Sequence, residues 1–139
     1  MKKVLFVEDE PNDVELISGI LSEYFFYDNI IIFKNGDELL NYLLQKKQID
    51  ETPLFIVLDL KLPGLSGAEV LRKIKSDDKL KYIPVIILTS SRENKDIEEC
   101  YHSGANAYVV KPIDFKDFEI AIKSLGIFWG TINVPPFNR

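Results

Sequence analysis

The sequence predicts an α/β fold in which five parallel strands alternate with helices in one doubly wound sheet, a (βα)5 arrangement. Two observations support this fold class. Five short apolar runs are continuous rather than alternating with polar residues, which is typical of strands buried on both faces of a parallel sheet. Between the runs, apolar residues recur at helical spacing, which indicates helices that cover the two faces. The apolar runs occupy residues 4–7, 30–33, 54–58, 85–88 and 107–110.

The first three helices are predicted from apolar residues three or four positions apart. Pro11, which suits the first turn of a helix, opens the first stretch, and Leu21 lies on its apolar face. The second stretch carries two pairs of leucines within residues 39–44, and the third places Val70 and Ile74 on one face. Each helix is therefore expected to pack against the sheet.

The last two helices are predicted mainly from their ends. Ser90 followed by Glu93 resembles a capping box at the start of the fourth helix, and Gly104 suits its end. Asp114 is the expected N-cap of the fifth helix, and Gly126 is placed to end it.

Length, charge and cysteine content limit the possible functions. The 139 residues are enough for one domain of this kind and too few for an appended effector domain. Seventeen Lys+Arg against 22 Asp+Glu give a net charge of −5, which disfavours nucleic-acid binding and favours protein partners. The composition argues against a membrane protein, and a single cysteine without a secretion signal predicts a cytoplasmic location.

Polar side chains follow four of the five predicted strands, at the edge where open α/β sheets bind ligands. Any one acidic residue there could be a helix cap or a solvated loop residue, but the combination points to a shared site. Carboxylates brought together by folding repel one another unless a cation neutralises them, and Mg²⁺ prefers such oxygen ligands. Together with a lysine and a hydroxyl, the set suits phosphoryl transfer to a carboxylate. Its members are Glu8, Asp9 and Glu10 after the first strand, Asp59, then Thr89 and Ser90, and finally Lys111.

Over residues 2–125 the chain resembles the receiver domain of two-component response regulators, such as the chemotaxis regulators. The motifs that carry the resemblance are Val7-Glu8-Asp9-Glu10, Leu58-Asp59-Leu60-Lys61-Leu62-Pro63-Gly64 with Gly67, Leu88-Thr89-Ser90 and Val110-Lys111-Pro112. The resemblance implies a flavodoxin-like receiver fold with strand order 2-1-3-4-5. Residues 1–125 would form the receiver domain, and residues 126–139 an apolar C-terminal extension without a separate effector domain.

The same resemblance implies roles for individual residues. Asp59 would accept a phosphoryl group from a sensor histidine kinase or a histidine phosphotransfer domain. Thr89 would hydrogen-bond that group and Lys111 would pair with it. The implied Mg²⁺ ligands are Glu8, Asp9, Asp59 and the backbone carbonyl of Lys61. Glu10 is not expected to be a ligand, because the residue at its position varies in the family.

Receivers often place an aromatic switch residue three positions before the lysine, and here it is Tyr108. The alternative is an ordinary strand aromatic with a solvent-facing hydroxyl. The Lys111–Pro112 bond is characteristically cis in receivers. On the fourth helix, His102 is expected to be a surface residue and Cys100 a small apolar one.

The C-terminal extension is unusually apolar for a chain end. Such a surface is not expected to remain in water, so the extension either folds back over its own domain or builds a homodimer, which is the predicted state. The extension is similar to that of the small response regulators that partner bacterial phytochromes. Its apolar residues are Ile127, Phe128, Trp129, Ile132, Val134 and Phe137.

Three other functions are alternatives to a phosphorylation-controlled switch. A flavin module would have a phosphate loop rich in glycine and hydroxyl residues, but the loop after the first strand is acidic. A haloacid-dehalogenase-type, Mg²⁺-dependent phosphatase needs a second aspartate two residues after its nucleophile, where Lys61 stands. A receiver-like adaptor that is no longer phosphorylated remains an alternative. We therefore expect a phosphoacceptor switch rather than an enzyme. By analogy with the receiver family, the first helix is the expected docking surface for its phosphodonor.

Overall fold

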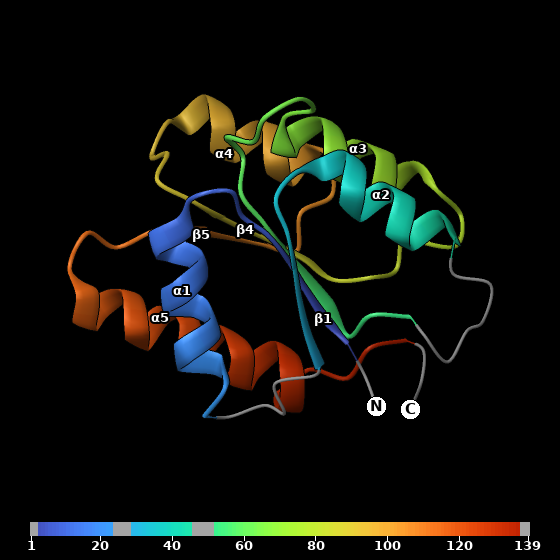
Figure 1. The fold of residues 1–139 in the computed structure, drawn as a ribbon. Helices are drawn as coiled ribbons and strands as arrows, with labels where there is room; N and C mark the ends of the chain where they lie inside the picture. Colours follow the sequence, from blue (N-terminus) through green and yellow to red (C-terminus); the bar gives the residue numbers. More distant parts are fainter. Residues whose placement is uncertain (1–2, 24–28, 46–51, 137–139) are drawn as a thin grey trace.

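The computed structural model describes residues 3–23, 29–45 and 52–136 (Figure 1). Five parallel strands form one sheet in the order β2-β1-β3-β4-β5, which confirms the predicted fold class and strand order. The strands are β1 (Val4–Val7), β2 (Ile30–Phe33), β3 (Phe55–Leu58), β4 (Val85–Thr89) and β5 (Ala107–Val110). Strands β1, β3 and β4 are fully buried because both faces of the sheet are covered, which explains their continuous apolar sequences.

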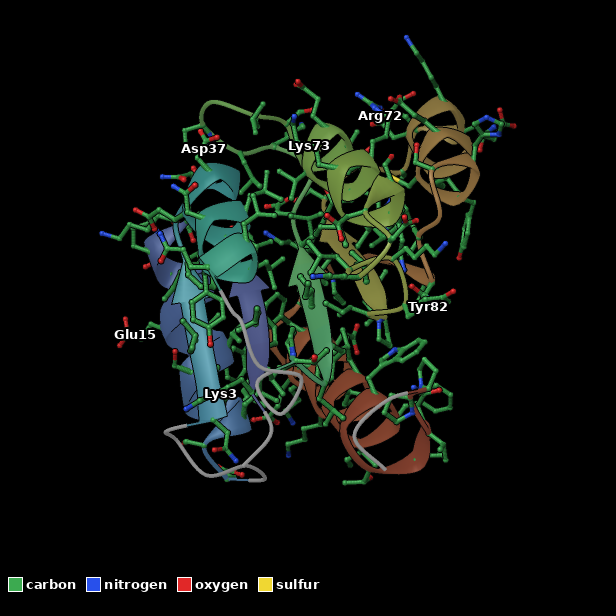
Figure 2. All side chains as sticks on the ribbon, turned by 90° about the vertical axis from the view of Figure 1, so that its right-hand side faces the viewer. Lys3, Glu15, Asp37, Arg72, Lys73 and Tyr82 are labelled. Atoms are coloured by element: carbon green, nitrogen blue, oxygen red, sulfur yellow. The ribbon has the colours of Figure 1, made fainter. Side chains whose placement is uncertain are left out.

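Helices cover the sheet on two sides, as Figure 1 shows. Side chains of α1 and α5 pack into one core layer, and those of α2, α3 and α4 pack into the other. Arg72 of α3, labelled in Figure 2, lies at the surface and forms an ion pair of 3.0 Å with Glu99 of α4, which joins these two helices. The helices are α1 (Pro11–Leu21), α2 (Gly36–Gln45), α3 (Gly67–Ser76), α4 (Asn94–His102) and α5 (Phe115–Ile127).

Two predicted helix ends differ from the structure. The capping box expected at Ser90 and Glu93 does not form, because α4 begins three residues later, with Glu93 itself as N-cap and no side-chain cap bond. A capping box does open α3, between Ser66 and Glu69. Gly126 does not end α5: it is buried within the helix, which extends to Ile127 because its apolar face still packs on the core.

Other local expectations agree with the structure. Pro11 occupies the first turn of α1, Asp114 is the N-cap residue of α5, and Gly104 follows α4 with a φ of 104°. His102 is exposed and Cys100 is buried, as expected. The Lys111–Pro112 bond is trans, contrary to the expectation from the family, since none of the described peptide bonds is cis.

Beyond α5, the C-terminal extension continues as one π-helical turn, η3 (Phe128–Ile132). Trp129 packs against the core layer formed by α1 and α5, so part of the extension folds back on its own domain. Ile132 and Val134 remain 61% and 71% exposed. Phe137 lies outside the described residues.

Candidate functional site

The carboxyl ends of four strands bring the predicted polar residues to one edge of the sheet. Backbone hydrogen bonds extend the strand pairing past the strand ends and so fix where these side chains begin. The N–H groups donate from Glu8 to Phe33 O (2.9 Å), from Asp59 to Val7 O (3.2 Å) and from Lys111 to Thr89 O (2.7 Å). The structure therefore brings together the residues that the sequence placed at separate strand ends.

Lys111 is the centre of this cluster. Its ammonium group donates to Glu8 Oε1 at 2.5 Å, to Asp13 Oδ2 at 2.9 Å and to Asp59 Oδ2 at 3.0 Å. A lysine ammonium has three N–H donors, so each of them faces a carboxylate. Only about a tenth of the Lys111 side chain is exposed, which strengthens these charged contacts.

Burial and charge act against each other in this cluster. Burial raises the pKa of Glu8 to about 7, although the hydrogen bond and the positive charge of Lys111 both lower it. Burial alone would lower the pKa of Lys111, but its hydrogen bonds to Glu8 and Asp13 and the charge of Asp59 outweigh burial and hold it above its ordinary value. The cluster thus keeps Lys111 charged, whereas the charge of Lys111 does not fully offset the cost of burying the ionised Glu8 carboxylate.

Three carboxylates are suitably placed for a divalent cation. One oxygen from each of Glu8, Asp9 and Asp59 lies within 4.8 Å of the others, with Glu8 and Asp59 buried and Asp9 exposed. Mg²⁺ fits this donor set, because it prefers oxygen ligands and commonly combines a few carboxylates with water. The N–H of Lys61 donates to Asp59 Oδ1 at 3.3 Å, and the proposed role of its carbonyl as a ligand stays a prediction.

Ser91 connects the end of β4 to the aromatic residue on β5. Thr89 is fully buried, and its hydroxyl oxygen accepts a long hydrogen bond of 3.5 Å from the Ser91 N–H. The hydroxyl of Tyr108 donates to the Ser91 carbonyl at 3.0 Å, so it does not simply face solvent. Ser91 also donates to Asp96 of α4 at 2.5 Å. One residue therefore contacts the strand end, the aromatic ring and the next helix.

Sequence reasoning missed Asp13 and Ser91. Asp13 follows Asp9 by four residues, and the helix start marked by Pro11 could have indicated that one turn would bring it back to the cleft. Glu10 is the N-cap of α1, and its carboxylate accepts from the Asp13 N–H at 2.9 Å. It therefore stabilises the helix start.

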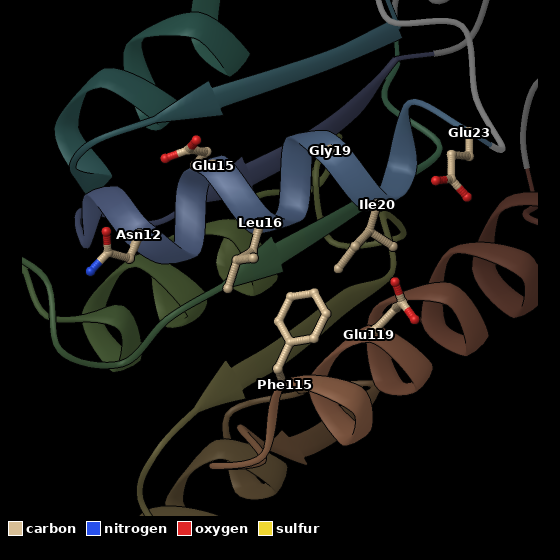
Figure 3. Close-up of a pocket in the computed structure, with 8 residues that line it drawn as sticks. All are labelled: Asn12, Glu15, Leu16, Gly19, Ile20, Glu23, Phe115 and Glu119. Carbon is tan, nitrogen blue, oxygen red and sulfur yellow. The ribbon is translucent and has the colours of Figure 1, made fainter.

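A groove of about 650 Å³ lies between α1 and α5 (Figure 3). Its apolar side chains come from both helices, with Phe115 of α5 pointing toward α1 near Leu16 and Ile20. Its charged residues are all acidic: Glu15, Glu23 and Glu119.

Within the described ranges 3–23, 29–45 and 52–136, no helix combines the length and the apolar character needed to cross a membrane.

Comparisons with known proteins agree with the fold and with the motifs. Residues 4–123 match the family described as "Response regulator receiver domain". Response regulator Rcp1 from Synechocystis sp. is 33% identical over 137 residues, which cover 96% of this chain and 93% of Rcp1.

Solved structures show the same relationship. The phosphorylated cyanobacterial phytochrome response regulator RcpA is 34% identical, with a TM-score of 0.88 over 97% of this chain and 98% of RcpA. The Mn²⁺-bound form of Rcp1 is 32% identical, with a TM-score of 0.87 over 98% of this chain and 99% of the other. The resemblance to phytochrome-associated regulators expected from the sequence is thereby confirmed, and the chain belongs to the response regulator receiver domain family of two-component signalling.

Proposed function

We propose that this protein is a stand-alone response regulator that accepts a phosphoryl group on Asp59 in a Mg²⁺-dependent reaction. The donor is a sensor histidine kinase or a histidine phosphotransfer domain, and the output passes through protein contacts. The observation that carries the proposal is the convergence of Lys111 with Asp59 at 3.0 Å, beside carboxylates suited to Mg²⁺. The relative Rcp1, a response regulator that this chain covers over 93% of its length, supports the stand-alone form.

The residues have distinct tasks in this reaction. An oxygen of Asp59 forms a bond to phosphorus while the phosphorus–nitrogen bond of the donor phosphohistidine breaks. The bonding electrons stay with the departing imidazole, which takes up a proton from solvent. Mg²⁺ held by Glu8, Asp9, Asp59 and the Lys61 carbonyl would supply positive charge to the phosphoryl oxygens. Lys111 pairs with the phosphoryl group, and the Thr89 hydroxyl donates a hydrogen bond to it.

Intact mass measurement tests the phosphoacceptor directly. Purified protein with Mg²⁺ and acetyl phosphate is expected to gain one phosphoryl group, and Asp59→Asn is expected to gain none. Asp78→Asn, the same chemical change at a side chain that is 97% exposed, serves as the control and keeps the adduct. An adduct that survives in Asp59→Asn contradicts the site, and no adduct in the wild type supports an unphosphorylated adaptor instead.

The phosphodonor protein is proposed to dock on α1, at the groove shared with α5. The groove combines an apolar floor with acidic edges, which suits a partner helix with an apolar stripe and basic flanks. Phe115→Ser is expected to slow transfer from a histidine phosphotransfer domain while leaving the reaction with acetyl phosphate unchanged. If the histidine phosphotransfer domain phosphorylated the wild type and Phe115→Ser at equal rates, the groove would not be the docking surface.

The protein is further proposed to be a cytoplasmic homodimer that binds no nucleic acid and no membrane. The dimer proposal is supported by the exposed apolar residues that extend beyond α5, Ile132 and Val134 among them. Light scattering of the full chain is expected to give the mass of a dimer, and Ile132→Ser is expected to shift it toward a monomer. Leu44→Ser, at an equally exposed leucine of α2, is the control and should leave the mass unchanged.

A further inference from the structure

Asp13 contributes a fourth carboxylate to the phosphorylation cleft. Its Oδ2 lies 2.9 Å from Lys111 Nζ, and about a quarter of its side chain is exposed. The α1 N-terminus fixes its position, because Pro11 begins the helix and the Glu10 carboxylate accepts from the Asp13 N–H. Asp13 thus reaches the lysine from a helix, whereas the other members of the cluster come from strand ends.

A count of charges shows what Asp13 changes. With its groups ionised, the cleft holds four carboxylates and one lysine, so its formal charge is −4 + 1 = −3. A bound Mg²⁺ would bring the charge to −1, and without Asp13 the same loaded cleft would be neutral. The incoming phosphoryl group is an anion, so an extra negative charge favours the cation and opposes the phosphoryl group.

Asp13 also occupies one of the three N–H donors of Lys111. The other two face Glu8 and Asp59, so a phosphoryl oxygen can gain the lysine only by competing with a carboxylate. Asp13 is not among the three carboxylates grouped for a cation, so it would act on a bound cation through its charge and not as a ligand.

We propose that Asp13 is a positioning residue that sets the charge of the cleft: it tightens Mg²⁺ binding and slows phosphoryl transfer to Asp59 by holding Lys111. This inference rests on the proposed function. The inference has one distinguishing feature: removal of the Asp13 charge should weaken Mg²⁺ binding and at the same time speed up phosphorylation. A merely structural role would not produce both effects, because a damaged cleft would bind the metal less tightly and accept phosphoryl groups more slowly.

The test uses Asp13→Asn in the full chain, which removes the charge and keeps an oxygen acceptor of the same shape. Calorimetric titration with Mg²⁺ alone is expected to show affinity weakened by about tenfold, the order expected when one unit charge near a divalent cation is removed from a well-solvated cleft. At saturating Mg²⁺, the rate constant for phosphorylation by acetyl phosphate is expected to rise by a similar factor. In that reaction Asp59 forms the bond to phosphorus as acetate leaves.

Two further variants complete the design. Asp13→Glu, which restores the charge, is expected to return both quantities toward the wild-type values. Asp78→Asn removes a charge from an exposed site on the connection after α3, and both quantities should stay at the wild-type values.

The outcomes separate this inference from the proposed function. Unchanged values in Asp13→Asn, or a slower phosphorylation together with weaker Mg²⁺ binding, would overturn the role of Asp13 alone. A wild-type protein that forms no adduct on Asp59 would overturn the proposed function and this inference with it.

Discussion

Gly67, the first residue of α3, lies directly against the loop that follows β3 and carries Asp59. Its N–H donates to Leu60 O at 2.8 Å. A Cβ at this position would lie 2.1 Å from Asp59 O and 2.6 Å from Leu60 Cα. These are backbone atoms, which cannot turn away as a side chain can. Gly67→Ala therefore requires α3 and the Asp59 loop to separate by about 1 Å, since ordinary contacts lie near 3.4 Å.

The size of the effect follows from this overlap. Overpacking destabilises a protein by about 1–3 kcal/mol, and we expect the upper end, about 3 kcal/mol, because the overlap here is with backbone atoms. In a chain of this length each kcal/mol lowers the melting temperature by about 2–4 °C, so Gly67→Ala is expected to melt roughly 6–12 °C below the wild type. Mg²⁺ affinity, measured by calorimetry below the transition, is expected to fall as well, because Asp59 moves.

Gly19 of α1 provides the matched control. A Cβ there meets no atom within 4 Å, so Gly19→Ala gains helix propensity without a clash and is expected to stabilise the protein by about 0.5–1 kcal/mol. If Gly67→Ala melted within 2 °C of the wild type and bound Mg²⁺ equally well, the close contact between α3 and the Asp59 loop would be refuted.

Three further predictions concern single residues. Lys111→Ala leaves the carboxylates of the cleft without their cation, so we expect tighter Mg²⁺ binding by calorimetry and a shorter-lived adduct by mass measurement. Burial and then the charges of Glu99 and Asp96 raise the pKa of the Cys100 thiol to about 11, so iodoacetamide at pH 8 should modify it far more slowly in native than in urea-unfolded protein. The Lys75 ammonium donates to Lys81 O, Ile83 O and Asn106 Oδ1, and Lys75→Met is expected to lower stability to urea by about 1–3 kcal/mol. Three results would contradict these arguments: equal modification rates of Cys100 in native and unfolded protein, an unchanged urea midpoint in Lys75→Met, or weaker Mg²⁺ binding in Lys111→Ala.

The strands and the strand-end residues were predictable because they depend on local pattern. A continuous apolar run indicates a doubly covered strand, and parallel strands necessarily deliver their carboxyl ends to one edge. Asp59 and Lys111 meet for that reason, although nothing local in either sequence shows the contact. The family resemblance supplied the strand order.

The features that the sequence did not predict depend on the rotation of a helix about its axis and on the residues at which helices begin and end. The Asp13–Lys111 contact joins residues 98 positions apart and requires a particular rotation of α1 about its axis. The N-cap of α4 lies three residues after the expected Ser90, and Ser91 rather than Ser90 contacts this helix, through Asp96. Gly126 stayed helical because burial of the face around Leu125 outweighed the weak preference of glycine for a helix end.

Helix α4 buries fewer side chains than the other four helices. Cys100 is its one buried residue, and no side chain caps its first turn. Most positions on this helix can therefore be exchanged without harm to the core, and Tyr101 is half exposed. Such a helix can diverge between duplicated genes while the fold and the cleft around Asp59 stay intact. It is thus the element in which we expect sister regulators of one cell to differ most, so that each answers its own pathway.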